Sequence, residues 1–153
     1  MSDQIRVATI AEVATFFRWA NEKCMQVKNG TPLLSAMLSP LRLHPTSKCF
    51  VAEMDGRIIG AVVFSTKDSE WELATVYVAK QYRHRGIALL LAQTGLRRLI
   101  DAGDTPIRSE AISRDGARLL NRLKEEFGEH LIIDDDGCYD SLPEQPDPPE
   151  PPK

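Results

Sequence analysis

Three side chains that carry or can acquire positive charge, Arg83, His84 and Arg85, stand directly before Gly86 and the start of a predicted helix. The first N–H groups of a helix have no intrahelical partner, and the helix dipole is positive at that end. A glycine there lets a ligand approach the backbone without meeting a Cβ atom. The spacing therefore predicts a binding site for an anion such as phosphate, although an ordinary solvated turn has the same outline.

One carboxylate, Glu72, stands on the otherwise mostly apolar stretch of residues 71–79 that precedes this turn. In general, desolvation moves the pKa of a carboxyl group upward, toward the range that suits a general base. The alternative is that Glu72 lies in water at the start of its strand. The residues alone leave both interpretations open.

The basic turn joins a predicted central strand to a predicted amphipathic helix. Strict alternation over residues 71–79 would place Trp71, Leu73, Thr75 and Tyr77 on one face of the strand and Glu72, Ala74, Val76 and Val78 on the other. From residue 88 onward, apolar residues recur at helical spacing, at Ala88, Leu91, Ala92, Gly95, Leu96 and Leu99. Gly103 suits the left-handed position that ends such a helix. We expect this helix to lie on the sheet that contains the strand.

The run Arg83-His84-Arg85-Gly86-Ile87-Ala88 resembles the Arg/Gln-x-x-Gly-x-Gly/Ala signature of the GCN5-related N-acetyltransferase (GNAT) family. The resemblance is tightest over residues 71–103, and the order of predicted elements fits over most of residues 4–142. Ala88 replaces the commoner glycine, a change that the family allows. The resemblance implies acetyl-CoA (coenzyme A) as cofactor, with its pyrophosphate on the loop amides and its pantetheine arm on the strand end. The cofactor-binding residues that it implies are Val76, Tyr77, Val78, Arg83, His84, Arg85, Gly86, Ile87 and Ala88.

The same resemblance implies catalytic roles for Glu72 and Tyr139. Glu72 lies eleven residues before Arg83, which is the spacing of the general-base glutamate in histone-acetylating members. Many members carry an Asn-x-x-Ala…Tyr pattern on the helix after the fifth strand. If Ala117 marks that alanine, Arg114 and Leu120 occupy the other two places and the usual tyrosine is missing. Tyr139 is the candidate substitute as acid for the leaving thiolate, and simple packing of this tyrosine is the alternative.

In the first part of the chain, alternating residue types predict a strand over residues 5–9, and a helix is predicted to follow. Thr9 and Glu12 have the spacing of a capping box, and the buried stripe of the helix is predicted at Val13, Phe16, Phe17, Ala20 and Cys24. A break over residues 28–32 precedes a short second helix near residues 33–38 and a loop. The resemblance places this region beside the acceptor site, so that His44 could touch substrate; a merely solvated histidine is the alternative.

The remaining segments predict further strands and one more helix. Asp55-Gly56 is a hairpin turn between strands at residues 48–54 and 57–66, a strand follows at residues 107–112, and a helix at residues 117–127 ends at Gly128. Residues 131–142 predict a final hairpin. Its three successive aspartates invite comparison with a calcium loop, but a loop with Gly137 as its glycine would place Ile132 and Pro143 at ligand positions, which favours a simple turn.

These elements, together with the resemblance, predict a mixed α/β (α+β) chain with a GNAT-like acyl-CoA N-acyltransferase fold. We expect a central mixed, mostly antiparallel sheet of six to seven strands, flanked by about four helices. Residues 1–142 would form the domain. Residues 143–153, with six prolines and no apolar anchor, would form an extended, disordered tail.

The composition fits a single domain without a nucleic-acid or membrane partner. The chain has 153 residues, 42% of them hydrophobic, with 19 basic and 22 acidic side chains and no stretch of membrane-spanning length. Its first residues lack the apolar run of a signal peptide. Cys24, Cys49 and Cys138 show neither CxxC pairing nor metal-ligand spacing. We therefore expect reduced, buried thiols, no metal site and a cytoplasmic location.

Two functions remain open at this point. The first is an acetyl-CoA-dependent N-acetyltransferase that moves an acetyl group to a primary amine of a small molecule or protein, by direct attack in a ternary complex. The second is a catalytically weak or inactive GNAT-fold accessory protein, phage-related ones included, that acts through protein–protein contacts. The intact loop of residues 83–88 favours the first, and the missing tyrosine and the proline-rich tail favour the second. A homodimer or a protein partner is compatible with both.

Overall fold

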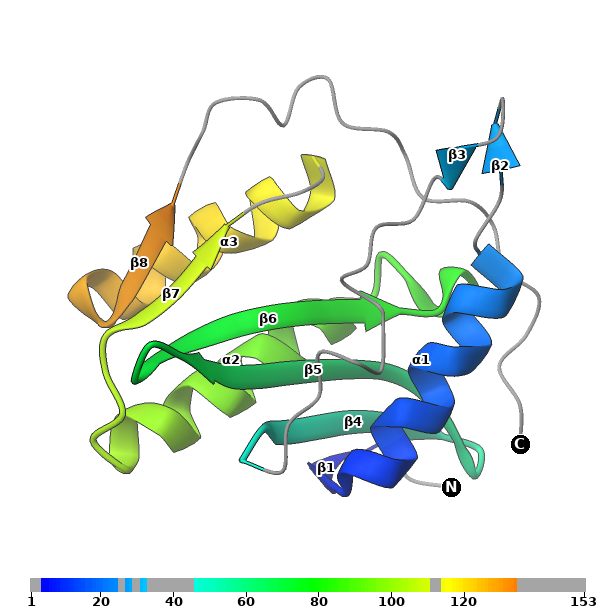
Figure 1. The fold of residues 1–153 in the computed structure, drawn as a ribbon, viewed down its shortest axis with the longest axis horizontal. Coiled ribbons are helices and arrows are strands. Elements are labelled where there is room, and N and C mark those ends of the chain that lie inside the picture. The colour runs from blue at the N-terminus through cyan, green and yellow to red at the C-terminus, as the bar shows by residue number, and fades with distance from the viewer. Residues whose placement is uncertain (1–3, 25–26, 29–30, 33–45, 111–113, 135–153) are drawn as a thin grey trace.

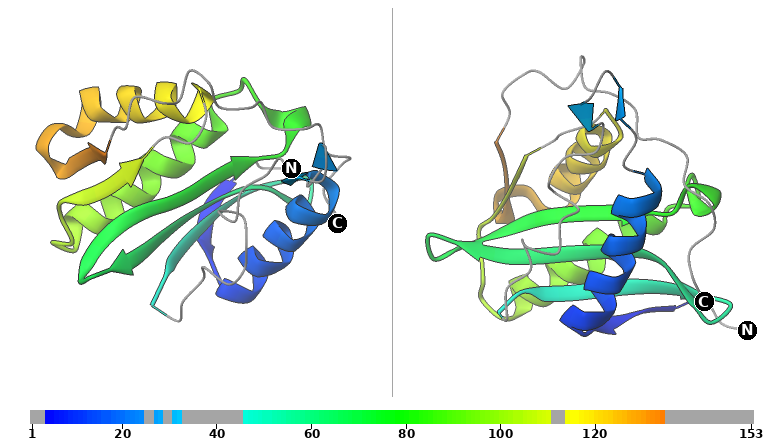
Figure 2. Two further views of the ribbon diagram at one scale, coloured as in Figure 1. Left: turned by 45° about the horizontal axis from the view of Figure 1, so that its top comes forward. Right: turned by 45° about the vertical axis from the view of Figure 1, so that its right-hand side comes forward.

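The computed structural model describes residues 4–24, 27–28, 31–32, 46–110 and 114–134, and the structural statements below concern these residues. A six-stranded sheet lies between α1 (Ile10–Cys24) on one face and α2 (Ile87–Asp101) and α3 (Arg114–Phe127) on the other (Figures 1 and 2). We call these faces the α1 face and the α2 face. The predicted mixed α/β fold is confirmed.

The sheet is antiparallel at one side and parallel at the other. Its order is β1–β4–β5–β6–β7–β8. The strands are β1 (Gln4–Ala8), β4 (Lys48–Met54), β5 (Arg57–Lys67), β6 (Glu70–Val78), β7 (Ile107–Glu110) and β8 (Leu131–Asp134). Pairing is antiparallel from β1 to β6 and parallel from β6 to β8. In a separate two-stranded sheet, β2 (Val27–Lys28) pairs antiparallel with β3 (Thr31–Pro32), where the sequence predicts only a break.

Each face of the sheet has its own hydrophobic core. The core of the α1 face includes Val13, Phe16, Phe17, Ala20, Val51, Ala61, Val63 and Tyr77. The core of the α2 face includes Phe64, Leu73, Leu91, Leu96, Leu99, Leu120 and Leu123. The apolar stripes predicted for α1 and α2 are therefore buried as expected, except that Ala88 is only half-buried and the side chain of Cys24 lies outside the described residues.

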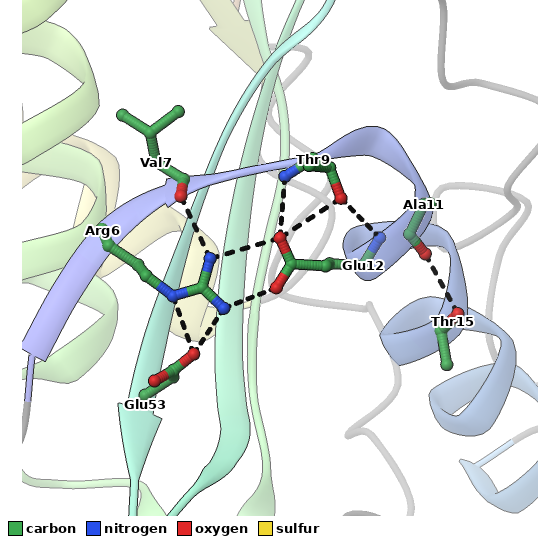
Figure 3. Close-up of polar contacts among 7 residues, drawn as sticks. All are labelled: Arg6, Val7, Thr9, Ala11, Glu12, Thr15 and Glu53. Carbon is green, nitrogen blue, oxygen red and sulfur yellow. Dashed lines mark hydrogen bonds and ion pairs between the residues drawn. The ribbon is translucent and has the colours of Figure 1, made fainter.

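Short-range signals at the ends of α1 and α2 have the structures predicted for them. Thr9 N donates to Glu12 Oε1 and Glu12 N donates to Thr9 Oγ1, both at 3.1 Å, which is a reciprocal capping box (Figure 3). At the end of α2, Gly103 N donates to Ile100 O at 3.0 Å and Asp104 N donates to Leu99 O at 2.9 Å. These two bonds form a Schellman motif, which ends the helix at the predicted glycine.

The capping box is also tied to the sheet through Arg6. Arg6 Nε donates to Glu53 Oε1 at 2.7 Å, and Arg6 Nη1 donates to Glu12 Oε1 at 3.2 Å (Figure 3). Hydrogen bonds from the Arg6 side chain, and then from the backbone of Thr9, lower the pKa of Glu12 to about 2. The two carboxylates raise the pKa of Arg6 above its already high value. This network fixes the start of α1 against β1 and β4.

A β-bulge in β6 changes which of its residues share a face. Leu73 and Thr75 lie opposite consecutive residues of β5, so Ala74 has no residue opposite it. The strict alternation predicted for residues 71–79 is therefore wrong beyond Ala74. The α1 face carries Glu72, Ala74, Thr75 and Tyr77, and the α2 face carries Trp71, Leu73, Val76 and Val78.

Several predictions concern residues that the structure does not describe. They are the second helix near residues 33–38, His44, the turn and second strand of the final hairpin with Tyr139 and Cys138, and the tail of residues 143–153. Within the described residues, no helix has both the length and the apolar character needed to cross a membrane.

Candidate active site

Strands β6 and β7 diverge soon after they begin to pair. Among the described residues, their register contains only Trp71 opposite Ile107 and Glu72 opposite Arg108. Ser109 Oγ then donates to Leu73 O at 3.2 Å, a side-chain contact in place of the backbone ladder. Figure 1 shows β7 turning away from β6 beyond this point. The second half of β6 therefore has an edge that no described strand covers.

The backbone of Val76 and Val78 faces this open edge. Ala79 N donates to Ile59 O at 2.8 Å, so Ala79 points its backbone groups toward β5. In an antiparallel pair, successive residues direct their N–H and C=O groups to opposite sides. The backbone groups of Tyr77 therefore share the direction of Ala79 and point toward β5. Val76 and Val78 point theirs away from β5, and an extended ligand could pair with them as an added strand does.

The predicted anion turn lies where β6 ends and α2 begins. The first helical bond runs from Leu90 N to Gly86 O at 3.0 Å, so the N–H groups of Ile87, Ala88 and Leu89 precede the helical ladder. Gly86 is the N-cap residue with φ +77°, and the position of a Cβ atom there is open space. The turn thus offers backbone donors, the positive end of a helix dipole and room for a ligand.

The three basic side chains of the turn have different surroundings. Arg83 Nε donates to Val78 O at 2.8 Å, and its guanidinium lies 5.2 Å from the centre of the Tyr77 ring. The Arg85 guanidinium lies 5.5 Å from the Tyr82 ring. His84 is exposed and has φ +63°, so the turn contains two left-handed residues. Arg83 is thereby oriented by the strand end, whereas His84 faces water.

Tyr77 lies in the core and not in the open edge. Its side chain is 2% exposed and packs against Phe16 of α1, with ring centres 6.0 Å apart. Its contribution to the site is the aromatic surface under Arg83. The sequence predicts Tyr77 as a cofactor contact, and the geometry assigns the backbone groups at the edge to its two neighbours.

Glu72 lies half-buried on the α1 face, at the point where β6 and β7 diverge. It stands opposite Ser65 of β5 and Arg108 of β7. Arg108 directs its guanidinium to other carboxylates, from Nε to Glu70 Oε2 at 2.7 Å and from Nη1 to Asp134 Oδ1 at 3.2 Å. Within the described part of the chain, no hydrogen bond or ion pair involves Glu72. It therefore has the setting of neither a fully buried base nor a fully solvated strand end.

The tyrosine that many family members carry as the acid for the leaving thiolate is absent from its expected place in this chain. Leu120, at one place of the expected Asn-x-x-Ala…Tyr pattern, is 3% exposed and packs in the core of the α2 face. The side chain of Arg114, at another place, and the whole of Tyr139 lie outside the described residues.

Sequence reasoning missed the bulge at Ala74 and the partners of Arg108. The bulge sets the faces on which Glu72 and Val76 lie, and no change in residue type marks it. The partners of Arg108 come from β6 and β8, which are far from it in sequence. The alternation of charged residues at Glu70, Glu72 and Arg108 is the signal that could have suggested one polar face at this end of the sheet.

Comparison with known proteins gives a family and a set of similar folds. The model of the acetyltransferase (GNAT) family matches residues 13–128. No curated protein sequence matches the chain. A solved structure of the ribosomal-protein-S18-alanine N-acetyltransferase from Escherichia coli is 14% identical, with a TM-score of 0.61, and the match covers 83% of this chain and 77% of that one.

Two further solved structures are similar over comparable lengths. The PaiA N-acetyltransferase from Thermoplasma acidophilum, in complex with coenzyme A, is 18% identical with a TM-score of 0.59, covering 82% of this chain and 89% of that one. The polyamine N-acetyltransferase of Drosophila melanogaster, which forms N-acetylagmatine, is 19% identical with a TM-score of 0.56, covering 80% and 82%. At these identities the likeness concerns the fold.

Proposed function

The chain belongs to the acetyltransferase (GNAT) family, and on that premise we propose that it transfers an acetyl group from acetyl-CoA to a primary amine by direct attack in a ternary complex. The acceptor is a small molecule or a protein, and the location is the cytoplasm. One observation carries the proposal: the open edge of β6 at Val76 and Val78 leads directly to the free N–H groups at the start of α2.

The residues present fit the cofactor in two places. The turn of residues 83–88 would hold the pyrophosphate, because it combines free amides, a helix N-terminus and the open space at Gly86. The backbone groups of Val76 and the N–H of Val78 would bind the pantetheine arm. Val78 O already accepts from Arg83, so Arg83 would shape the end of this edge. When bound, acetyl-CoA supplies the activated thioester.

Glu72 is the proposed general base. A protonated amine has no lone pair for attack, so a group of the protein must accept its proton. Glu72 lies where β6 and β7 separate, and no ion pair within the described residues occupies its carboxylate. It can therefore bind the ammonium group of an acceptor and then take its proton. Tyr139, as acid for the leaving thiolate, is a second part of the proposal.

The choice of acceptor stays within two classes. The similar structures include an enzyme that acetylates polyamines and one that acetylates the alanine of a ribosomal protein. A small diamine and the amino end of a protein both present a primary amine to Glu72. We therefore propose a primary amine without restricting it further.

The burial of Leu120 favours a second candidate function, that of a GNAT-fold accessory protein with little or no transferase activity. The leucine has no proton to donate at a place where many relatives carry a tyrosine. Such a protein would still bind coenzyme A on the turn and the β6 edge, and would act through protein contacts.

Turnover by the wild-type protein separates the two functions, and turnover by Glu72→Gln tests Glu72 as the base. The assay measures thiol release from acetyl-CoA with a panel of amines, after calorimetry has measured CoA binding. We expect Glu72→Gln to retain CoA affinity and to lose roughly 10²–10⁴-fold in turnover at neutral pH. The loss should shrink at high pH, where the amine loses its proton in solution.

Glu125→Gln, an exposed change on α3, is the matched control and should keep full turnover. Full turnover by Glu72→Gln at neutral pH would exclude Glu72 as the base. If the wild-type protein binds CoA and acetylates no amine, the accessory function is the correct one.

A further inference from the structure

We propose that Glu70 and Asp134 are positioning residues that hold the guanidinium of Arg108 away from Glu72 and so keep the Glu72 carboxylate available to the acceptor amine. The inference rests on the proposed role of Glu72 as the base. It adds a second requirement to that role, namely that the arginine opposite Glu72 be engaged elsewhere.

The register places Arg108 beside Glu72. The two residues lie directly opposite each other on the parallel strands β7 and β6, and directly opposite residues share a face of the sheet. Neighbouring strands are about 4.8 Å apart. Arginine and glutamate are both long enough to meet across that distance, so an ion pair between them is the default expectation for these two positions.

The structure has a different arrangement of the Arg108 side chain. Its Nε donates to Glu70 Oε2 at 2.7 Å, and its Nη1 donates to Asp134 Oδ1 at 3.2 Å. Glu70 lies on β6 two residues before Glu72, and Asp134 is the last residue of β8. One guanidinium thus joins three strands, β6, β7 and β8, at the end of the sheet where β6 and β7 still pair.

A paired Glu72 would be a poor base. An arginine within about 4–6 Å stabilises the charged form of a carboxylate, and a guanidinium can occupy both carboxylate oxygens at once. A carboxylate held in this way resists accepting a proton and has no free oxygen for an ammonium group. By binding Arg108 from two other strands, Glu70 and Asp134 leave Glu72 as the carboxylate that an incoming cation meets.

Two further charged residues occupy register positions next to this network. Lys67 of β5 lies opposite Glu70, and Glu110 lies opposite Asp134 in the register of β7 and β8. The three side chains of the network are each about half exposed, at 41% for Arg108, 54% for Glu70 and 52% for Asp134. A single ion pair at such exposure is weak. Two carboxylates acting together hold the guanidinium better than either does alone, and this predicts a non-additive effect of removing them.

The test measures the titration of the Glu72 carboxyl group by ¹³C NMR, with the signal assigned from its absence in Glu72→Gln. Glu70→Gln and Asp134→Asn alone should each move the Glu72 midpoint little. The double variant should lower it by about 1–3 pH units, which is the effect of a newly adjacent arginine. In the acetyl-transfer assay, the acid limb of the pH–rate profile should move down by the same amount.

Arg108→Gln added to the double variant is the matched control, because it removes the charge that is released. The excess shift should then disappear. Arg108→Lys, with both carboxylates intact, is an independent variant: a lysine cannot bridge two carboxylates in the geometry of a guanidinium, so it too should lower the Glu72 midpoint. Melting temperatures and amide spectra show which variants keep the fold, and Arg108→Lys decides the question if the double variant does not.

Additive shifts in the double variant, or a shift that survives Arg108→Gln, would overturn the inference, because both indicate a simple change in charge. So would an unchanged midpoint in Arg108→Lys. These outcomes are separate from failure of the proposed function, which appears as full turnover by Glu72→Gln. The NMR titration reads the Glu72 carboxylate directly and needs no turnover.

Discussion

Arg83 and Gly86 define the anion turn at the scale of single residues, through two different properties. Arg83 is oriented by a hydrogen bond to Val78 O at 2.8 Å and by the ring of Tyr77 beneath it. Gly86 supplies a positive φ of 77° and the open space next to the free amides of α2. The side chain contributes charge, and the glycine contributes access to the backbone.

Replacement of Gly86 by Asp should abolish CoA binding, because a side chain and a negative charge then occupy the space that the phosphate must enter. Calorimetry with CoA measures this directly. Gly86→Ala tests the backbone cost alone, since its Cβ would meet no atom within 4 Å, and it should weaken binding less than Asp does.

Gly103→Asp provides the matched control for this prediction. Gly103 lies just past the other end of α2, with φ +80° and equally open space around its Cβ position. The variant has a similar backbone strain far from the turn, so it should bind CoA normally. Normal CoA binding by Gly86→Asp would show that the turn is not the pyrophosphate site.

Cys49 is a buried structural residue, as the sequence predicts. It is 2% exposed in the core of the α1 face, and burial raises the pKa of its thiol to about 11. The reactive thiolate is therefore scarce at neutral pH. This cysteine has no part in the proposed chemistry.

At the scale of secondary-structure elements, α1 and α2 are attached to the sheet in different ways. The start of α1 is held by the charged network of Arg6, Glu12 and Glu53. The middle of α2 is held by close packing, because Gly95 faces the ring of Phe64 on β5. The attachment of α1 depends on pH, because it rests on charged carboxylates. The attachment of α2 depends on the side-chain volume at position 95.

The Glu12→Gln variant should be less stable than the wild type by about 1 kcal/mol at pH 7, the size of a capping contribution. The pKa of Glu12 is lowered from its ordinary 4.5 to about 2 in the folded chain. The ionised carboxylate of Glu12 therefore contributes its full stabilisation above about pH 4.5, and this contribution is lost as the pH falls toward 2. Urea unfolding at pH 7, 4 and 2 measures the difference.

The difference in unfolding free energy between wild type and Glu12→Gln should therefore be constant from pH 7 to about pH 5 and nearly zero at pH 2. Glu129→Gln, an exposed change outside this network, should show no such trend. A difference that is as large at pH 2 as at pH 7 would exclude the charge of Glu12 as its cause.

The Gly95→Ala variant should destabilise the protein, although Ala is the better helix former by about 1 kcal/mol. A Cβ atom at this position would lie 2.0 Å from Phe64 Cε2 and 2.6 Å from Phe64 Cζ. Overpacking of a buried core typically costs about 1–3 kcal/mol, so the clash outweighs the gain in helix propensity.

Thermal or urea unfolding measures the outcome, with Arg98→Ala as the control on the exposed face of the same helix. Arg98→Ala should leave the stability nearly unchanged. Equal or higher stability of Gly95→Ala would show that α2 can move away from β5 without loss of packing.

At the scale of the whole molecule, the described helices cover both faces of the sheet, and no described strand covers one edge of the second half of β6. Among the described residues, α1 packs on the α1 face, and α2 and α3 pack on the α2 face (Figure 2). Between them, β6 separates from β7 after two paired residues. This divergence joins the proposed cofactor edge, the turn and Glu72 into one region.

Deletion of residues 143–153 should leave the melting temperature and CoA affinity unchanged. The segment contains six prolines and no apolar anchor, so it offers no surface to offset the entropy of ordering it. Differential scanning calorimetry and CoA titration of the shortened chain, beside the full chain, measure both properties. A clear drop in melting temperature would show that the tail packs on the domain.

The sequence by itself determined the features that depend on neighbours along the chain. The capping box at Thr9 and Glu12, the turn at Asp55 and Gly56, and the Schellman end of α2 at Gly103 all have the predicted structure. Each is formed by residues within about one helical turn or one hairpin, so the residue types alone specify the hydrogen bonds. The resemblance that rests on residues 83–88 likewise led to the correct family.

Only the tertiary structure decided which distant residues meet. The bulge at Ala74, the divergence of β7, the engagement of Arg108 by Glu70 and Asp134, and the contact of Gly95 with Phe64 all depend on the register of strands far apart in sequence. A register is set by the packing of the whole sheet, and a shift of one residue reverses the face of every side chain that follows. For this reason the types of the candidate site residues could be predicted, whereas their faces and partners could not.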